Sequence, residues 1–547
     1  MAPKHLDTAH TVATRKTLKT HGLVPPSVES HETQALRCLS NLASKSTQIE
    51  KYLYLSHLRN HQTHLFYRLL AQNMKAFTPL IYTPVVGEAC QRWSEIYQQP
   101  EGLYLSYSDR GSLSAILRNW HQANVEITVV TDGSRILGLG DLGINGMGIP
   151  VGKLALYSGC AGIDPAKTLP ITLDLGTNNK KLWEDPLYMG SKRPRVSADE
   201  EVAFLDDLME ALTTVWPSIV VQFEDFKNPF PALERYQSKY AFFNDDIQGT
   251  GAVILSGVIN ALRKTGLPIK DQRAVFMGAG SAGVGVAKQI VAYFIQEGGM
   301  SEDAARQCFW FVDTKGLITK NRGDALASHK TYFARLDNGN QQFRTLEEVI
   351  EYVKPTMLMG LSTIHDVFSP AILRRMAQIN TQPIIFPLSN PSDKSECTFA
   401  AAMAQTENCA IVASGSPWPD YTDAHTGKIY PSNQGNNMYI FPGLGLASIL
   451  CKATHITDAM IYRSATALAD SLTPQEKDEG RLYPAIERIR DVSVRVACEV
   501  IRQAQSDDVD GESMKRELRQ LGDAALEDWV RARMYDAWRA EAVRSKL

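Results

Sequence analysis

The chain has 547 residues, 44% of them hydrophobic, and its 57 Lys and Arg against 60 Asp and Glu leave a net charge of −3. This length exceeds what one hydrophobic core accommodates, so several domains are expected. A nearly neutral chain without an apolar run of roughly 20 residues attracts neither nucleic acid nor a membrane, which makes a small molecule the expected partner.

The N-terminal 20 residues are basic, with four Lys or Arg and one acid, Asp7. This composition is compatible with a short mitochondrial presequence. The segment is interrupted, however, and runs at once into His21–Pro26, so we favour a cytoplasmic protein and keep the mitochondrial matrix as the alternative. Eight scattered cysteines without a Cys-x-x-Cys pair fit a reducing compartment.

Apolar residues at helical spacing over residues 29–73 predict a helical N-terminal region. Residues 103–175 alternate β-rich runs with Gly-rich turns, which indicates an α/β unit. A second α/β unit is expected from residue 245 to about 436, because strand and helix patterns alternate there and predict a parallel sheet. From about residue 507 the composition predicts a helical tail that serves assembly.

A glycine-rich stretch follows the first expected strands, with six glycines between Gly138 and Gly152. So many glycines suggest backbone pressed close to a ligand. Arg135, before this stretch, could bind a carboxylate through two hydrogen bonds, and Lys153, at the start of an apolar helix, could be desolvated enough to act as a base. Taken singly, each is more simply a surface cation, and Tyr82 is more simply a packing residue.

Four carboxylates stand at the ends of two predicted strands. Residues 219–223 end in Glu224 and Asp225, and residues 240–243 precede Asp245 and Asp246. Open α/β sheets bind ligands at such strand ends, and crowded carboxylates repel one another unless a cation is present. The pattern therefore predicts a hard divalent ion, Mg²⁺ or Mn²⁺, against the alternative of N-cap or surface acids.

A dinucleotide site is predicted where the strand at residues 273–277 leads into a G-x-G-x-x-G loop and then a helix. The glycines allow the pyrophosphate to approach the amides at the helix N-terminus, and the alternative is a glycine-rich loop for packing alone. The loop and the first helical residues that would bind the cofactor are Gly278, Gly280, Ser281, Ala282 and Gly283.

The second strand of this unit, residues 309–313, ends in Asp313, where an acid would meet the adenosine ribose. Asp313 lies 30 residues beyond Gly283, later than the usual spacing of about 20, so one long helix and its connection are expected between the strands. Four basic residues follow, and such a cluster could neutralise a 2′-phosphate and favour NADP over NAD, although a solvated basic face would look the same. These residues are Lys315, Lys320, Arg322 and Lys330.

Taken together, these segments resemble the malic enzyme family, in its large eukaryotic-type branch. The motifs that carry the resemblance occur in one order over most of the chain: Tyr82-Thr83-Pro84-Val85-Val86-Gly87, Ser108-Asp109-Arg110-Gly111, the run from Arg135 to Lys153, Gln222-Phe223-Glu224-Asp225-Phe226, Phe243 to Thr250, Leu388-Ser389-Asn390-Pro391, Ala413 to Pro417, and Gln434 to Gly443.

The resemblance implies an α/β protein with a helical N-terminal domain, a split central α/β catalytic domain, a Rossmann-type domain with a doubly wound parallel sheet that binds NAD(P), and a short helical C-terminal tail. It also implies a homotetramer, a dimer of dimers. The expected boundaries are residues 1–100, 101–244 plus 438–508, 245–437 and 509–547, respectively.

The resemblance further implies oxidative decarboxylation of L-malate to pyruvate and CO₂, with reduction of NADP or NAD and a divalent metal. Lys153 would be the general base, Tyr82 the general acid, and Asp245 a partner that tunes Lys153. The implied metal ligands are Glu224, Asp225 and Asp246. The residues implied to hold malate are Arg135, Asn390 and Asn437, and Asn390 would also contact the cofactor.

Three points qualify the resemblance. NADP-preferring members have Ser-Lys-Gly after the strand-end acid, whereas this chain has Thr314-Lys315-Gly316 with Lys330 downstream; NADP is expected, with dual use open. An Asn-Lys-Gly-x-Ala-Phe segment common near the family N-terminus is replaced by residues 13–20, which puts subunit contacts there in doubt. Fumarate-activated members use two arginines, and this chain has Arg37 but His61 at the other position, so weak or absent activation is expected.

Two other functions compete with malate oxidation. A malolactic enzyme would use the same fold, metal and dinucleotide but release lactate without net cofactor reduction. A catalytically silent dinucleotide-binding regulator would show decay at the chemical positions, yet the tyrosine, lysine and carboxylates described above are all present.

Overall fold

A computed structural model describes residues 7–323 and 326–538. Residues 1–6, which include Lys4 of the presequence alternative, and residues 539–547, the end of the expected tail, lie outside the described residues. Within the described part, no helix combines the length and the apolar character needed to cross a membrane.

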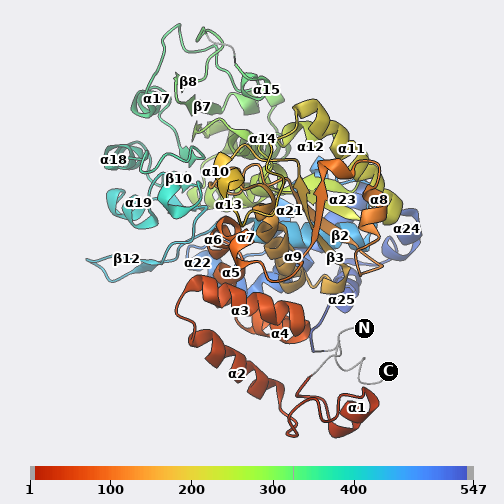
Figure 1. The fold of residues 1–547 in the computed structure, drawn as a ribbon. Helices are drawn as coiled ribbons and strands as arrows, with labels where there is room; N and C mark the ends of the chain where they lie inside the picture. The colour runs from red at the N-terminus through yellow and green to blue at the C-terminus, as the bar shows by residue number, and fades with distance from the viewer. Residues whose placement is uncertain (1–6, 324–325, 539–547) are drawn as a thin grey trace.

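The helical N-terminal region is confirmed and lies at the foot of the molecule in Figure 1. Capping starts its helices: Thr47 and Glu50 form a capping box at the start of α3, and Ser30 caps α2. The helices are α1 (Val12–Thr17), α2 (His31–Ala43), α3 (Gln48–His61), α4 (Thr63–Gln72), α5 (Met74–Ile81), α6 (Val85–Gln91) and α7 (Trp93–Ile96).

The central unit contains a five-stranded sheet in the order β1-β3-β2-β4-β5, and all of its pairs are parallel. Its strands are β1 (Leu103–Ser106), β2 (Ile127–Thr131), β3 (Thr168–Asp174), β4 (Val220–Phe223) and β5 (Phe242–Asn244). Buried residues run without interruption along β2 to β5, as expected for a parallel sheet covered on both faces. The helices of this unit are α8 (Leu113–Leu117), α9 (Gly148–Ala161), α10 (Lys180–Glu184), α11 (Ala198–Val215) and α12 (Phe230–Tyr236).

A second sheet of six strands has the order β11-β10-β9-β6-β7-β8 and is parallel except for the β7–β8 pair. Its strands are β6 (Ala274–Met277), β7 (Phe309–Asp313), β8 (Gly316–Leu317), β9 (Met357–Gly360), β10 (Ile384–Pro387) and β11 (Ile411–Val412). Strand β7 pairs with one edge of β6, and β9, which comes later in the chain, pairs with the other edge. The strand order therefore reverses between β6 and β9. Ligands bind at such a switch point.

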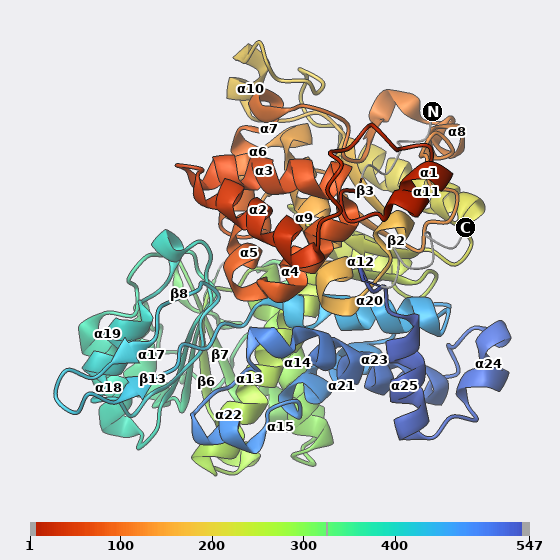
Figure 2. The ribbon, with the colours of Figure 1, turned by 90° about the horizontal axis from the view of Figure 1, so that it is seen from below.

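Helices cover this second sheet, which forms a separate lobe in Figures 1 and 2. The interval between the glycine loop and Asp313 holds two helices, α14 and the short α15, rather than the one long helix expected; the extra helix accounts for the wide spacing. The helices are α13 (Thr250–Thr265), α14 (Ser281–Gln296), α15 (Glu302–Arg306), α16 (Ser328–Thr331), α17 (Leu346–Val353), α18 (Pro370–Ile379) and α19 (Phe399–Gln405), and a hairpin of β12 (Tyr421–Thr422) and β13 (Ile429–Tyr430) follows.

After the hairpin the chain returns to the central unit. There α20 and α23 pack on α9, and α21 packs on α13, so the last helices join the two sheets into one core. The tail packs on its own chain: α25 lies on α23, and Tyr535 contacts Tyr67 of α4. These helices are α20 (Phe441–Leu450), α21 (Asp458–Ala469), α22 (Pro474–Asp478), α23 (Ile489–Ser506), α24 (Glu512–Leu518) and α25 (Asp523–Arg533).

Candidate active site

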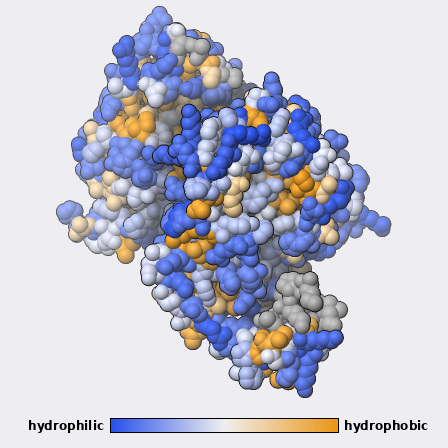
Figure 3. Space-filling model, viewed as in Figure 1, coloured by the Kyte–Doolittle hydropathy of each residue, from blue (hydrophilic) through white to orange (hydrophobic). Residues whose placement is uncertain are grey.

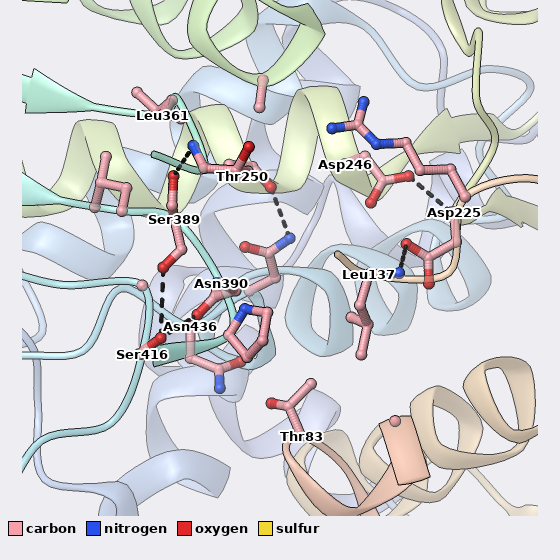
Figure 4. A pocket seen from close by; sticks show the side chains of 18 of the residues that line it. Thr83, Leu137, Asp225, Asp246, Thr250, Leu361, Ser389, Asn390, Ser416 and Asn436 are labelled. Carbon is pink, nitrogen blue, oxygen red and sulfur yellow. Dashed lines mark hydrogen bonds between the residues drawn. The ribbon is translucent and has the colours of Figure 1, made fainter. Parts of the chain in front are cut away.

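A cavity of about 430 Å³ lies between the N-terminal helices, the central sheet and the second sheet. Tyr82, Arg135, Lys153, the three predicted metal ligands, Asn390 and Asn437 all line it, together with Gly280, Ser281, Ala282 and Gly283. Figure 4 shows Asp225 and Asp246 on one side and Ser389, Asn390 and Leu361 on the other. Residues predicted from widely separated parts of the sequence therefore meet around one space.

The three predicted metal ligands lie together at the ends of β4 and β5. Glu224, Asp225 and Asp246 each offer an oxygen, and these atoms lie within 4.8 Å of one another. Asp225 has a φ of +58°, which turns its side chain into the cluster; its Oδ1 accepts from Leu137 N at 3.1 Å, whereas its buried Oδ2 has no hydrogen-bond partner.

This cluster has the electrostatics of a cation site. Burial, reinforced by the Glu224 carboxylate, raises the pKa of Asp225 to about 8, and burial raises the pKa of Asp246 as well. Carboxylates crowded in a dry site retain protons unless a cation compensates them. Three oxygen ligands and an unpartnered carboxylate oxygen fit Mg²⁺ or Mn²⁺ with coordination positions left for a substrate.

Lys153 lies on α9 and is 1% exposed. Its Nζ is 2.5 Å from Asp245 Oδ2, 2.9 Å from Glu224 Oε1 and 4.5 Å from the centre of the Phe441 ring. The expected desolvation is present, but it does not produce a low pKa. Burial disfavours the ammonium, yet the Asp245 and Glu224 carboxylates outweigh it and hold the pKa of Lys153 well above its usual value.

Asp245, behind Lys153, is fully buried. Asn437 Nδ2 donates to its Oδ2 at 2.9 Å, and the same amide lies 3.0 Å from Thr250 Oγ1. Asp245 Oδ1 is buried without a hydrogen-bond partner. Asp245 does not line the cavity, so its contact with the site passes through Lys153 and Asn437.

Tyr82 follows α5 and is 7% exposed. Lys153 Nζ lies 5.5 Å from the centre of its ring. Burial raises the pKa of Tyr82, so the phenol holds its proton at neutral pH. A buried phenol beside a lysine is arranged to donate a proton into the cavity.

Arg135 is exposed to the cavity and forms no ion pair within the described residues. Its loop is held by Arg195, which the sequence did not single out. Arg195 Nε donates to Asp141 Oδ2 and its Nη2 to the carbonyl of Asp132, both at 2.9 Å. Arg195 lies outside every motif used above, so its contact with this loop had no sequence signal.

Asn390 enters from the loop after β10. Ser416 Oγ donates to Asn390 Oδ1 at 2.8 Å. The glycine-rich stretch approaches closely, because a Cβ on Gly138 would lie 3.0 Å from the Asn390 carbonyl oxygen. A glycine at this position therefore brings the Arg135 loop beside Asn390.

The glycine loop after β6 has the geometry expected of a dinucleotide site. Gly278 has a φ of +112°, and a Cβ there would lie 2.3 Å from the Leu361 carbonyl; a Cβ on Gly283 would lie 2.6 Å from the Gly278 carbonyl. Nothing lies within 4 Å of a Cβ on Gly280, which faces open space. Gly280 gives α14 no side-chain cap, so the first amides of Ser281 and Ala282 are available to a phosphate.

Asp313, at the end of β7, lies outside the cavity lining and is held by two cations. Arg322 Nη1 and Lys330 Nζ lie 2.7 and 3.0 Å from its carboxylate oxygens, and Lys315 N donates at 2.9 Å. Burial would raise the pKa of Asp313, but the hydrogen bonds from Arg322 and Lys330 keep it below its usual value. Positive charge thus surrounds the strand-end acid.

A glycine loop at the switch point of a parallel sheet defines a dinucleotide-binding enzyme, and sequence comparisons identify its family. Residues 247–505 match the malic enzyme NAD binding domain, and residues 59–237 match the malic enzyme N-terminal domain. The chain therefore belongs to the malic enzyme family, which confirms the resemblance stated above.

Individual proteins similar to this chain are also malic enzymes. The NADP-dependent malic enzyme of Dictyostelium discoideum is 48% identical over 492 residues, 90% of each chain. The NAD-dependent malic enzyme of Acinetobacter baylyi is 42% identical and covers 92% of this chain and 89% of its own. The crystal structure of a malic enzyme from Pyrococcus horikoshii has the same fold, with a TM-score of 0.57, 23% identity, and coverage of 86% of this chain and 91% of that one.

Proposed function

We propose that this malic enzyme oxidises L-malate and decarboxylates the product to pyruvate and CO₂ while reducing NADP, with NAD as the weaker cofactor. The observation that carries the proposal is the cavity in which Lys153, Tyr82 and the carboxylate cluster face the glycine loop. Relatives named for NADP and for NAD both match nearly the whole chain, which supports either dinucleotide.

In the proposed mechanism, Arg135, Asn390 and Asn437 hold malate against the cavity wall. Lys153 Nζ accepts the proton of the C2 hydroxyl as a hydride leaves C2. This requires a neutral amine, and Asp245 Oδ2, 2.5 Å away, is placed to take the lysine proton. Asp245 therefore serves Lys153 rather than the substrate.

Glu224, Asp225 and Asp246 would hold Mg²⁺ or Mn²⁺, which supplies positive charge to polarise the hydroxyl and to stabilise charge left after CO₂ departs. Bound dinucleotide supplies the hydride acceptor. The Tyr82 hydroxyl then gives its proton to C3 of the three-carbon product. Its raised pKa keeps this proton in place until C3 becomes basic.

The direct test is the initial rate of reduced-cofactor formation from L-malate and Mn²⁺, with NADP and NAD in parallel at equal concentrations. Faster reduction of NADP would support the proposal, and faster reduction of NAD would overturn only the cofactor preference. Lactate without cofactor reduction would favour the malolactic alternative. Dinucleotide binding without any turnover would favour the silent regulator.

NADP preference rests on the charge around Asp313, and it leads to a prediction for Lys330. Replacing Lys330 with Gln removes a cation from the strand-end carboxylate, whose negative charge then opposes a 2′-phosphate. We expect KM for NADP to rise about tenfold, with little change for NAD. Lys270→Gln, at an exposed lysine outside this basic cluster, is the matched control. Equal effects on both cofactors, or the same effect in the control, would contradict the assignment.

Regulation is predicted from the N-terminal helices. Arg37 is engaged by Glu29, and His61, at the position expected for the second arginine, stacks on His57 with ring centres 4.3 Å apart. We expect fumarate to raise the initial rate at subsaturating malate weakly or not at all. A several-fold increase in that rate would show the prediction to be wrong.

The assembly is proposed to be a homotetramer, a dimer of dimers. Large apolar side chains are exposed on the N-terminal segment, where Figure 3 shows hydrophobic patches at the foot of the view. Such patches favour burial against another chain. They include Val12, Leu23, Val28 and Leu36. Light scattering coupled to gel filtration would measure the mass.

The domain boundaries and the compartment complete the proposal. We propose a helical domain over residues 1–100, a central domain over 101–244 plus 438–508, a Rossmann-type domain over 245–437 and a tail over 509–547. The division between residues 244 and 245 is supported by the two separate sheets, β1 to β5 before it and β6 to β11 after it. We place the enzyme in the cytoplasm, with the mitochondrial matrix as the alternative; fluorescence microscopy of a C-terminally tagged chain distinguishes them.

A further inference from the structure

A buried carboxylate outside the cavity lining joins two of the loops that form its wall. Glu396 lies between β10 and α19 and is fully buried. Within the described residues it forms no ion pair, because its partners are neutral donors. Burying a carboxylate without a cation is costly unless hydrogen bonds satisfy it.

Four donors satisfy this carboxylate, two from each loop. Ser362 gives its N and its Oγ to Glu396 Oε1, both at 2.9 Å. Ser389 gives its Oγ to Oε1 at 2.6 Å and its N to Oε2 at 3.2 Å. Thr363 N donates to Ser389 Oγ at 2.9 Å, which joins the loops directly. Glu396 is therefore the shared acceptor of both loops.

The strand ends make room for this arrangement. β9 and β10 are adjacent and parallel, so the loops that follow them leave the same edge of the sheet. A Cβ on Gly360 would lie 2.6 Å from Glu396 Cδ, so a side chain at the end of β9 would collide with the Glu396 carboxylate. The close packing indicates a fixed position for Glu396.

The two loops form one wall of the cavity, where each lies beside a different proposed ligand. Leu361, next to Ser362, donates its N to Met277 O at 2.8 Å, and its carbonyl lies against Gly278 of the dinucleotide loop. Asn390, next to Ser389, lines the cavity where malate is proposed to bind. Figure 4 shows Leu361, Ser389 and Asn390 along one wall.

We propose that Glu396 is a positioning residue that sets the distance between the dinucleotide loop and Asn390. It acts from behind the wall by holding Ser362 and Ser389, and it touches neither ligand. The inference rests on the proposed function for its malate assay, but its dinucleotide-binding assay is independent of catalysis.

The test is Glu396→Gln, which keeps the size of the side chain. Whichever way the amide is turned, its NH₂ replaces an acceptor and faces at least one of the four donors, so the loops must separate. A buried donor left without an acceptor disfavours this arrangement of the two loops, so we expect KM for malate and Kd for NADPH to rise about tenfold or more. NADPH fluorescence measures Kd without turnover.

The matched control is Glu476→Gln. Glu476 is also buried, accepts from Thr473 N and Ala485 N at 2.8 Å each, and lines no part of the cavity; unlike Glu396 it also pairs with a cation, Arg488, at 2.5 Å. It should lower Tm but leave KM and Kd unchanged. Ser362→Ala removes one donor to Glu396 from a residue outside the cavity lining. It should raise both KM for malate and Kd for NADPH, by a smaller factor, and it replaces Glu396→Gln as the test if that variant does not fold.

Unchanged KM and Kd in Glu396→Gln, or in Ser362→Ala where only that variant folds, would overturn the proposal. Equal increases in the Glu476→Gln control would also overturn it, because the effect would then be a general loss of stability. If the wild-type chain binds NADPH but oxidises no malate, the proposed function fails, and a raised Kd in Glu396→Gln still supports the positioning role.

Discussion

The Lys153→Ala variant is expected to lose malate oxidation by about 10²- to 10⁴-fold, the usual contribution of a general base. Lys153 contacts both Asp245, a proton acceptor, and Glu224 of the cation cluster, within hydrogen-bond distance of each. Dinucleotide binding should persist, because among the described residues Lys153 forms its hydrogen bond and ion pairs with Asp245 and Glu224 and not with the glycine loop or α14. Steady-state rates and NADPH fluorescence measure the two effects separately.

Lys153→Arg is the control for a purely structural role. Arginine keeps the positive charge beside Asp245 and Glu224 but does not lose its proton in proteins. A folded Lys153→Arg enzyme should therefore be as inactive as the alanine variant. Substantial turnover in either variant, at wild-type Tm, would show that Lys153 is not the base.

Metal removal is expected to abolish malate oxidation, and Mn²⁺ is expected to raise Tm more at about pH 8 than at about pH 6. In the metal-free protein, burial raises the pKa of Asp225 to about 8 and also raises that of Asp246. Unfolded aspartates titrate near about 3.9. Between the pKa of the unfolded aspartates and the raised pKa of the folded ones, the folded state binds more protons than the unfolded state. The stability of the metal-free protein therefore falls as pH rises through this range.

The cation changes that balance because it binds the ionised carboxylates. Below the raised pKa, the cation must displace protons from the carboxylates. Each displaced proton weakens cation binding about tenfold for every pH unit by which the pH is lowered. Thermal unfolding with EDTA or Mn²⁺ at the two pH values measures the shift. Asp246→Asn removes one carboxylate and should reduce both the shift and its pH dependence. An equal Mn²⁺ shift at both pH values would contradict the assignment of this cluster as the metal site.

Much of the fold and the site could be predicted because the relevant signals are local. Glu224 and Asp225 follow one apolar strand and Asp245 and Asp246 another, and parallel strands bring such ends to one edge. The glycines of the dinucleotide loop lie between a strand and a helix, which is enough to expect close packing with a neighbour. That the neighbour is Leu361 follows only from the order of the strands in the sheet.

What could not be predicted depends on contacts between distant segments. Glu396 looks like an ordinary acid in the sequence, and its four donors come from residues that are 7 and 34 positions away. Arg195 reaches Asp132 over 63 positions. The pKa of Lys153 could not be predicted either, since desolvation alone lowers it and only the positions of Asp245 and Glu224 reverse the direction.

The burial of α9 has a consequence for how the chain is made. All fourteen of its residues are buried, and much of that burial comes from α20 and α23, which are encoded in the last fifth of the chain. During synthesis an apolar helix that carries Lys153 leaves the ribosome long before these partners exist. A nascent or truncated chain that ends before Ile489 therefore presents α9 as a binding segment for chaperones, and the active site is assembled only when translation is nearly complete.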